Sequence, residues 1–175
     1  MKYSKAEMFN RKASSPKSKP DKILETLALR QGQSIADIGS GGGSPAIPLK
    51  LALPAMSLTM VESKARKTAF LREVVRQLQL ADVRVEAARY EELLVRPDLH
   101  DAMDILTMRA VRVDGRTLAN LQAFVRENGK IWLFRALGPD VPALPPSLSL
   151  VATVPLIESL RSRLVVIEKH RPGAS

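Results

Sequence analysis

Short apolar segments with strand-like composition alternate with segments of helical periodicity along this 175-residue chain. Five such strands are predicted at residues 34–38, 57–61, 83–87, 103–107 and 130–134. Strands that alternate with helices form a parallel sheet covered on both faces, because each right-handed crossover passes over one face. Two later strands, near 149–154 and 163–168, have no room between them for a full helix. The order of elements therefore predicts an α/β fold with a mostly parallel seven-stranded sheet, helices on both faces and a C-terminal antiparallel hairpin.

The length of the chain is enough for one hydrophobic core and too short for two ordinary domains. We expect a single domain over residues 21–170, a loosely ordered basic arm at residues 1–20 and a tail at residues 171–175. Helices are expected from the capping residue Asp21, from Pro45 or Pro48 to Leu53, and at residues 63–80, 90–94 and 117–127. Trp132 lies in the fifth predicted strand and is expected to be part of the core.

Composition restricts the chemistry that this chain can carry out. It has no cysteine, which excludes disulfides, thiolate metal sites and cysteine nucleophiles. His100 and His170 are far apart in the sequence and argue against a histidine metal site, so we expect no metal. No apolar segment follows the first basic residues, and the longest uncharged stretch, residues 141–157, contains four prolines. We therefore expect a cytoplasmic protein with no signal peptide and no membrane-spanning helix.

The charge of the chain is strongly positive. Lys and Arg number 27 against 18 Asp and Glu, which gives a formal net charge of +9. Residues 1–22 contain seven basic and two acidic residues and so carry +5 of this charge. An excess of this size favours partners such as RNA, DNA or an anionic membrane surface, although simple solubility would also account for it.

A glycine-rich loop follows the first predicted strand, where ligands bind in open α/β sheets. Residues 37–43 read DIGSGGG, and the glycines allow a sharp turn and the close approach of a ligand. Diphosphate cofactors favour the spacing GxGxxG and the free N–H groups of a helix N-terminus. This loop has the spacing GxGxG, a preceding Asp37 that would repel phosphate, and Pro45 and Pro48, which have no N–H. The loop could still be only a structural turn.

Glu62 adds a second condition on the ligand. It lies 19 residues after Gly43, at the end of the second predicted strand, where an acid can accept both hydroxyls of a ribose. An adenosine that has no phosphates and carries an amino acid meets both conditions. The sequence therefore predicts a site for S-adenosylmethionine.

Four segments of the chain have counterparts in one bacterial family. They are residues 41–49 (GGGSPAIPL), 62–71 (ESKARKTAFL), 107–111 (TMRAV) and 163–169 (RLVVIEK). In these segments the chain resembles the glucose-inhibited division protein B family, which has GxGFPGIPL in the first and TARAV in the third. The resemblance implies a Rossmann-like class I methyltransferase that uses S-adenosylmethionine and methylates N7 of a guanine in 16S ribosomal RNA. Ribosomal RNA or the small ribosomal subunit would then be its partner.

The chain departs from the family pattern at several positions. Ser44 replaces an aromatic residue, Ala46 replaces a glycine, and Arg135 and Ala136 stand where Lys-Gly is usual. The family's N-terminal His…Asp-Ser-Leu element is absent from residues 1–33. The resemblance is therefore more complete in the segments expected to bind the cofactor than in those expected to bind the substrate.

The residues expected to bind the cofactor follow the ends of four predicted strands. They are Asp37, Gly39, Ser40, Gly41, Gly43, Glu62, Ser63, Ala88, Arg89, Tyr90 and Arg109. Residues 88–90 would line the adenine, although a solvated helix start and hinge packing of Tyr90 explain them equally well. Arg109 is also the catalytic candidate, since the resemblance implies that it lies beside the methyl group. It could instead form an ion pair with Asp104 or Glu62.

Guanine N7 carries a lone pair in the neutral base, so its methylation needs no general base and the lack of a catalytic histidine is no objection. Two alternatives remain open. The acceptor could be a small molecule or a protein, or the chain could be an RNA-binding protein whose cofactor site is degenerate.

Overall fold

The computed structural model describes residues 28–109, 113–136, 141–157 and 162–171. The expected basic arm, the expected helix from Asp21 and most of the expected tail lie outside these ranges. Within them, no helix is both long and apolar enough to cross a membrane.

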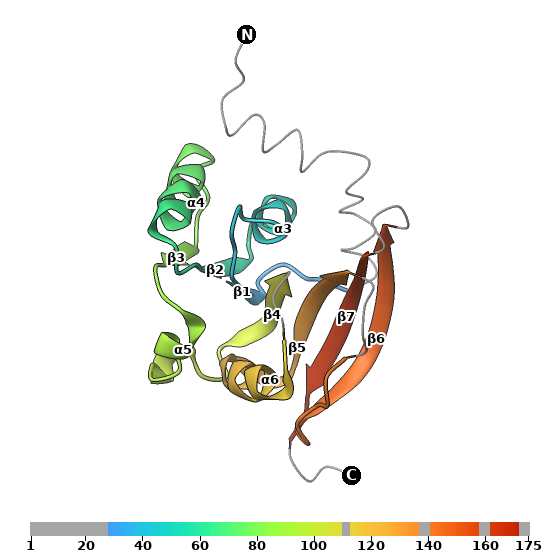
Figure 1. The fold of residues 1–175 in the computed structure, drawn as a ribbon. Helices are drawn as coiled ribbons and strands as arrows, with labels where there is room; N and C mark the ends of the chain where they lie inside the picture. The colour runs from blue at the N-terminus through green and yellow to red at the C-terminus, as the bar shows by residue number, and fades with distance from the viewer. Residues whose placement is uncertain (1–27, 110–112, 137–140, 158–161, 172–175) are drawn as a thin grey trace.

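The described strands form one seven-stranded sheet in the order β3-β2-β1-β4-β5-β7-β6 (Figure 1). Their bounds are β1 Ser34–Ile38, β2 Ser57–Val61, β3 Val83–Glu86, β4 Met103–Arg109, β5 Val125–Ala136, β6 Leu148–Ile157 and β7 Ser162–Lys169. Strands β1 to β5 pair in parallel, whereas β7 is antiparallel to both β5 and β6. The predicted fold class is therefore confirmed, including the closing hairpin.

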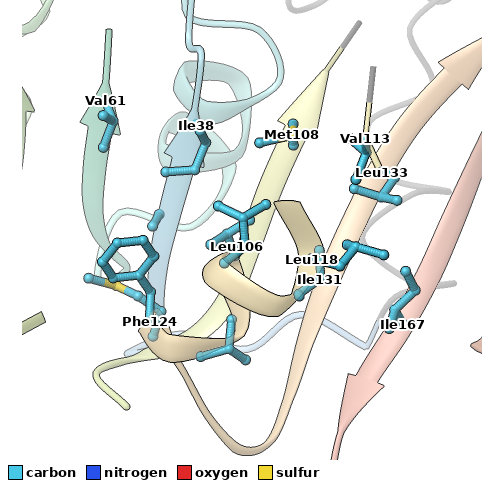
Figure 2. Packing of buried hydrophobic residues seen from close by; sticks show 14 of the residues in the cluster. Ile38, Val61, Leu106, Met108, Val113, Leu118, Phe124, Ile131, Leu133 and Ile167 are labelled. Carbon is cyan, nitrogen blue, oxygen red and sulfur yellow. The ribbon is translucent and has the colours of Figure 1, made fainter. Parts of the chain in front are cut away.

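Helices cover both faces of this sheet (Figure 1). Their bounds are α3 Ala46–Ala52, α4 Ala65–Gln77, α5 Tyr90–Leu93, η1 Pro97–Leu99, α6 Gly115–Leu121 and η2 Gln122–Phe124. Apolar side chains of α3 and α4, such as Ile47 and Leu71, pack in one core cluster. Those of α5, η1, α6 and η2, such as Leu118 and Phe124, pack in the other, which Figure 2 shows against Leu106 and Ile131 of the sheet.

Alternation along β5 explains how one strand supplies both clusters. Successive strand residues point to opposite faces, so Ile131 and Leu133 join the α6 side while Trp132 joins the α3 side. Trp132 is fully buried, which confirms its predicted place in the core.

The helix predicted at residues 117–127 is wrong in both bounds. It begins at Gly115, because Asp114 Oδ1 accepts a hydrogen bond from the backbone N–H of Thr117 at 2.7 Å and caps the helix. It ends at Leu121 and continues as η2 to Phe124, and Val125 already belongs to β5. Residues 126–129 lie on β5 between the partners of Met103 and Ile105, where the pairing of the two strands is irregular.

Strand β4 extends two residues beyond its predicted end, to Arg109. This extension places the catalytic candidate, Arg109, on the strand itself, at the carboxyl ends of the parallel strands.

Candidate functional site

Three neighbouring strands end at the same level of the sheet. Ile38 at the end of β1 is in register with Val61 of β2 and with Met108 of β4. Gly39, Glu62 and Arg109 therefore follow at adjacent positions. The order of strands reverses between β1 and β4, which is the point at which open α/β sheets bind ligands.

The glycine loop is tied to the end of β2. The backbone N–H groups of Gly39 and Ser40 donate to Val61 O at 2.9 and 3.2 Å. Gly41 and Gly43 have φ angles of 54° and 82°, which side chains rarely adopt. A Cβ on Gly43 would lie 2.4 Å from Ile47 Cδ1, so the last glycine allows α3 to pack closely on the loop. The loop thus has a backbone shape that requires glycine at these two positions.

Glu62 is buried, and the backbone around it holds its carboxylate. Its Oε2 accepts a hydrogen bond from Gly41 N at 3.0 Å, and its Oε1 accepts one from Lys64 N at 2.9 Å. Thr68 Oγ1 donates to the backbone O of Glu62 at 3.0 Å. Each carboxylate oxygen has a second lone pair, so both remain able to accept a ribose hydroxyl. The carboxylate is therefore fixed beside the glycine loop in a form that suits a sugar diol.

Asp37 is almost completely buried one residue before the end of β1. Thr107 Oγ1 donates to its Oδ1, whereas its Oδ2 is buried and has no hydrogen-bond partner. Burial raises the pKa of Asp37 to about 6, although hydrogen bonds from Thr107 and Ser40 and the nearby charge of Arg109 lower it. An unpaired buried carboxylate is costly. A ligand with an ammonium group at this end of the loop would supply the missing electrostatic partner.

Arg109 is exposed and turns toward the start of α3. Its Nη1 donates to Ser44 Oγ at 3.1 Å. The alternative ion pair with Asp104 is wrong, because Asp104 lies near the other end of β4 and pairs with Arg126 at 3.1 Å. Glu62 directs its carboxylate to backbone N–H groups, and in the part of the chain that is described no ion pair joins it to Arg109.

The residues after β3 are less well defined as a site. Ala88 is half-buried against the α6-side core, and Arg89 is exposed. Tyr90 is also half-buried, and burial raises its pKa while hydrogen bonding with Thr117 and Asn120 of α6 lowers it. This contact with α6 favours a packing role for Tyr90. The role of these residues toward an adenine remains a prediction, as does that of the exposed Ser63.

A family model described as rRNA small subunit methyltransferase G, or GidB, matches residues 21–140 of the chain. The chain belongs to this family. The homologue from Dichelobacter nodosus is 36% identical over 152 residues, which cover 85% of this chain and 70% of the relative. The homologue from Desulfitobacterium hafniense is 41% identical over 88 residues, which cover 50% of this chain and only 37% of the relative. Both relatives are named ribosomal RNA small subunit methyltransferase G.

Several solved structures share the fold. The putative methyltransferase yhhF from Escherichia coli superposes with a TM-score of 0.71 at 14% identity and covers 90% of this chain and 89% of its own. TrmN from Thermus thermophilus gives 0.71 at 20% identity, covering 91% of this chain and 52% of its own. A mutant of MtNAS in complex with S-adenosylmethionine gives 0.68 at 18% identity, covering 87% and 60%. The Rossmann-like class I methyltransferase fold of this GidB family member is thereby confirmed.

Three contacts of the site were not anticipated from the sequence. Thr107 binds the buried Asp37, Ser44 binds Arg109, and Lys67 Nζ lies 3.8 Å from the position that a Cβ on Gly41 would take. A polar residue inside the apolar strand β4 is a signal for Thr107, and the loss of the family's aromatic residue is a signal for Ser44. Nothing in the pattern distinguishes Lys67 from the other exposed cations of α4.

Proposed function

We propose that this chain is an S-adenosylmethionine-dependent methyltransferase that methylates N7 of a guanine in 16S ribosomal RNA. The observation that carries the proposal is Glu62, a buried carboxylate fixed beside a phosphate-excluding glycine loop at the switch point of the sheet. Family membership supports the choice of ribosomal RNA as acceptor. The net charge of +9 is consistent with an RNA partner.

Each part of the loop region would bind a different part of the cofactor. Glu62 would accept the two ribose hydroxyls, and the turn at Gly41 leaves no side chain against the sugar. Asp37 would place a negative charge near the ammonium of the methionine moiety, where its Oδ2 now has no hydrogen-bond partner. When bound, the cofactor would supply a methyl group on a positively charged sulfur: a nucleophile bonds to the methyl carbon, and the sulfur leaves as the neutral thioether of S-adenosylhomocysteine.

The chain itself contributes position and electrostatics rather than proton transfer. Guanine N7 attacks with a lone pair that it already has, and the methylated base becomes positively charged. Arg109, at the end of β4, would stand beside the methyl group. A general base is unnecessary, which fits a site in which no histidine lies beside Asp37, Glu62 or Arg109 in the described residues.

Nucleoside mass spectrometry of 16S ribosomal RNA tests the proposal. Cells that lack this chain should lose one 7-methylguanosine, and the wild-type chain should restore it. The Glu62→Ala variant should restore little, because it loses the carboxylate that would hold the ribose. Glu73→Ala, on the surface of α4, is the matched control and should restore methylation fully.

Calorimetry with S-adenosylhomocysteine separates the cofactor from the acceptor. Binding by the wild type that weakens at least about 10-fold in Glu62→Ala supports the cofactor site, since a hydrogen bond to a charged group contributes about 1.5–3 kcal/mol. Equal affinity in the two proteins would contradict it. Normal cofactor binding with unchanged ribosomal RNA would instead point to a small-molecule or protein acceptor.

A further inference from the structure

Two arginines lie directly opposite each other at the carboxyl end of β5. Arg135 of β5 is the register partner of Arg163 of β7, the antiparallel strand beside it (Figure 1). Residues in this relation have Cβ atoms about 4.5–5.5 Å apart, and like charges placed opposite each other are destabilising. The pair therefore lowers the stability of the sheet unless a negative group lies near both guanidinium groups.

Both arginine side chains point to the α6 side of the sheet. Leu133 of β5 and Val165 of β7 are also register partners, and both belong to the core cluster on that side. Because strand residues alternate between faces, residues two positions away on the same strands lie on the same face. Arg135 and Arg163 therefore stand together above this pair, one layer nearer to the carboxyl end of β5.

The arginine pair is near the proposed cofactor site and separate from it. Arg109 is in register with Phe134, the residue before Arg135. It lies on the opposite face, because Ile105, four positions earlier on β4, belongs to the cluster on the α3 side. Neighbouring strands are about 4.8 Å apart, so the pair lies roughly 5–10 Å across the sheet from β4. The proposed cofactor has no phosphate and would be bound by other strands.

The charge of Arg135 has no acceptor among the described residues. The side chain is half-buried, and its Nη1 is buried with no hydrogen-bond partner. Strand β6, on the outer side of β7, has no charged residue, and no ion pair between described residues includes Arg135. A buried N–H group of a cation that has no acceptor costs free energy. An anion at this position would remove the cost.

A phosphodiester fits two adjacent guanidinium groups. Each guanidinium presents a planar fork of N–H donors that matches phosphate oxygens, and such charge-assisted hydrogen bonds are strong. The net charge of +9 favours a polyanion over an isolated anion. A nucleotide whose base reaches the end of β4 has its phosphates at a distance comparable with that between β4 and the pair. The phosphate of an RNA acceptor therefore satisfies both the chemistry and the position.

We propose that Arg135 and Arg163 together bind one backbone phosphate of the RNA acceptor. This inference rests on the proposed function and gives the acceptor a binding site of its own, on strands other than those of the cofactor. Arg135 stands where Lys-Gly is usual in the family. A lysine provides a single point of charge, whereas the arginine of this chain provides parallel donors for two phosphate oxygens.

Inorganic phosphate tests the site without RNA. Thermal unfolding would be compared in sodium phosphate and in sodium chloride at the same ionic strength and pH. Phosphate also stabilises proteins by its exclusion from their surface, an effect that all variants share. The wild type should show an additional stabilisation from binding, and Arg135→Gln should lose it. Arg171→Gln is the matched control and should keep it, since Arg171 is an exposed cation beyond the far end of β7.

The stability of Arg135→Gln in chloride separates a binding role from a structural one. A binding arginine predicts a variant at least as stable as the wild type, because the substitution removes like-charge repulsion and a buried donor without an acceptor. A large loss of stability would instead mean that an acid of the chain itself, such as Asp140 or Glu158, neutralises the pair. That result would overturn the inference.

Binding of a 16S ribosomal RNA fragment at several salt concentrations identifies the source of the phosphate. Arg135→Gln should weaken binding at least about 10-fold at low salt. The slope of log K against log salt should become shallower by about 0.7–0.9, which corresponds to one phosphate contact. Arg135→Lys should keep most of the slope because it keeps the charge, and should lose part of the affinity because it lacks the fork. Affinity for S-adenosylhomocysteine should stay unchanged in every variant.

Equal RNA affinity and equal salt slope in Arg135→Gln and Arg171→Gln would overturn the inference. Loss of the phosphate effect with an unchanged RNA slope would also overturn it, because the pair would then bind a small phosphate-containing molecule. Failure of the wild type to bind S-adenosylhomocysteine is a separate result. It would reject the proposed function, while the measurements with inorganic phosphate would still decide whether the arginine pair binds an anion.

Discussion

At the scale of single residues, the site depends on a contact between Asp37 and Thr107, which are 70 positions apart in the chain. The hydroxyl of Thr107 donates to one oxygen of this buried carboxylate, and the second oxygen has no hydrogen-bond partner. The fold therefore holds a carboxyl group whose pKa is raised to about 6. Proton binding to this one side chain is linked to the stability of the whole domain.

The stability of the Asp37→Asn variant relative to the wild type should depend on pH. Between about pH 4 and 6 the unfolded wild type ionises Asp37 while the folded protein keeps it protonated, so the wild type loses stability as pH rises. Asparagine does not titrate. The free energy of unfolding of the variant should therefore rise by about 3 kcal/mol relative to that of the wild type over this interval, with no further change at higher pH. Urea unfolding of both proteins from pH 4 to 8 would measure the difference.

Asp114→Asn is the control for this experiment. Its exposed carboxylate accepts the capping hydrogen bond of α6, and that bond lowers its pKa. The stability that the Asp114 carboxylate contributes is present above the ordinary pKa of an aspartate and is lost as pH falls. Its pH dependence therefore has the opposite sign to that of Asp37. A stability difference for Asp37→Asn that stays flat between pH 4 and 6 would show that this carboxyl is ionised in the folded protein at lower pH.

At the scale of elements, local patterns in the sequence predict the position of strands and helices. They do not predict features that depend on residues distant in the chain. The bounds of β1 and β2 agree with their predicted ranges, because Gly32 and Gly39 flank the first apolar run and Pro54 and Glu62 lie on either side of the second. The helix at 117–127 was overextended, because Phe124 and Val125 are apolar and continue a helical spacing. They end the helix because their side chains are buried and a strand begins there. Glu62 was predicted by spacing, whereas Thr107 depends on a strand register that spacing does not reveal.

Lys169 is the long-range contact that stabilises the end of α6 and η2. Its Nζ donates to Gln122 O at 2.9 Å and to Val125 O at 2.7 Å, and it also pairs with Asp101 at 2.7 Å. Lys169→Met should lower the free energy of unfolding by about 2–4 kcal/mol, because two partly buried carbonyl groups lose a charged donor. Urea denaturation at pH 7 would measure the loss.

Arg171→Met is the control for Lys169. It removes an exposed cation that pairs with Glu127 at 3.7 Å, and such surface pairs contribute at most about 1 kcal/mol. Equal losses for the two variants would mean that the contacts of Lys169 with backbone carbonyls contribute nothing beyond an ordinary surface charge.

At the scale of the whole molecule, charge separates the two binding events that the proposed function requires. Residues 1–22 carry +5 of the net charge of +9, so residues 23–175 carry the remaining +4. The cofactor would be held by hydrogen bonds and through its zwitterionic methionine moiety, so its binding should depend little on this net charge. A polyanionic acceptor gains from every cation within reach of its phosphates.

Affinity for a fragment of 16S ribosomal RNA should therefore fall steeply with salt, while affinity for S-adenosylhomocysteine should change little. Counterion release makes the logarithm of the RNA binding constant linear in the logarithm of the salt concentration, with a slope of about −0.7 to −0.9 for each phosphate contact. Replacing the seven basic residues among residues 1–22 by glutamine should make this slope shallower by one such increment for each residue that contacts RNA. The same variant should bind the cofactor product as the wild type does, because the sugar and loop contacts come from Gly41 and Glu62. A salt slope that the seven substitutions leave unchanged would assign RNA binding to the cations of residues 23–175 alone.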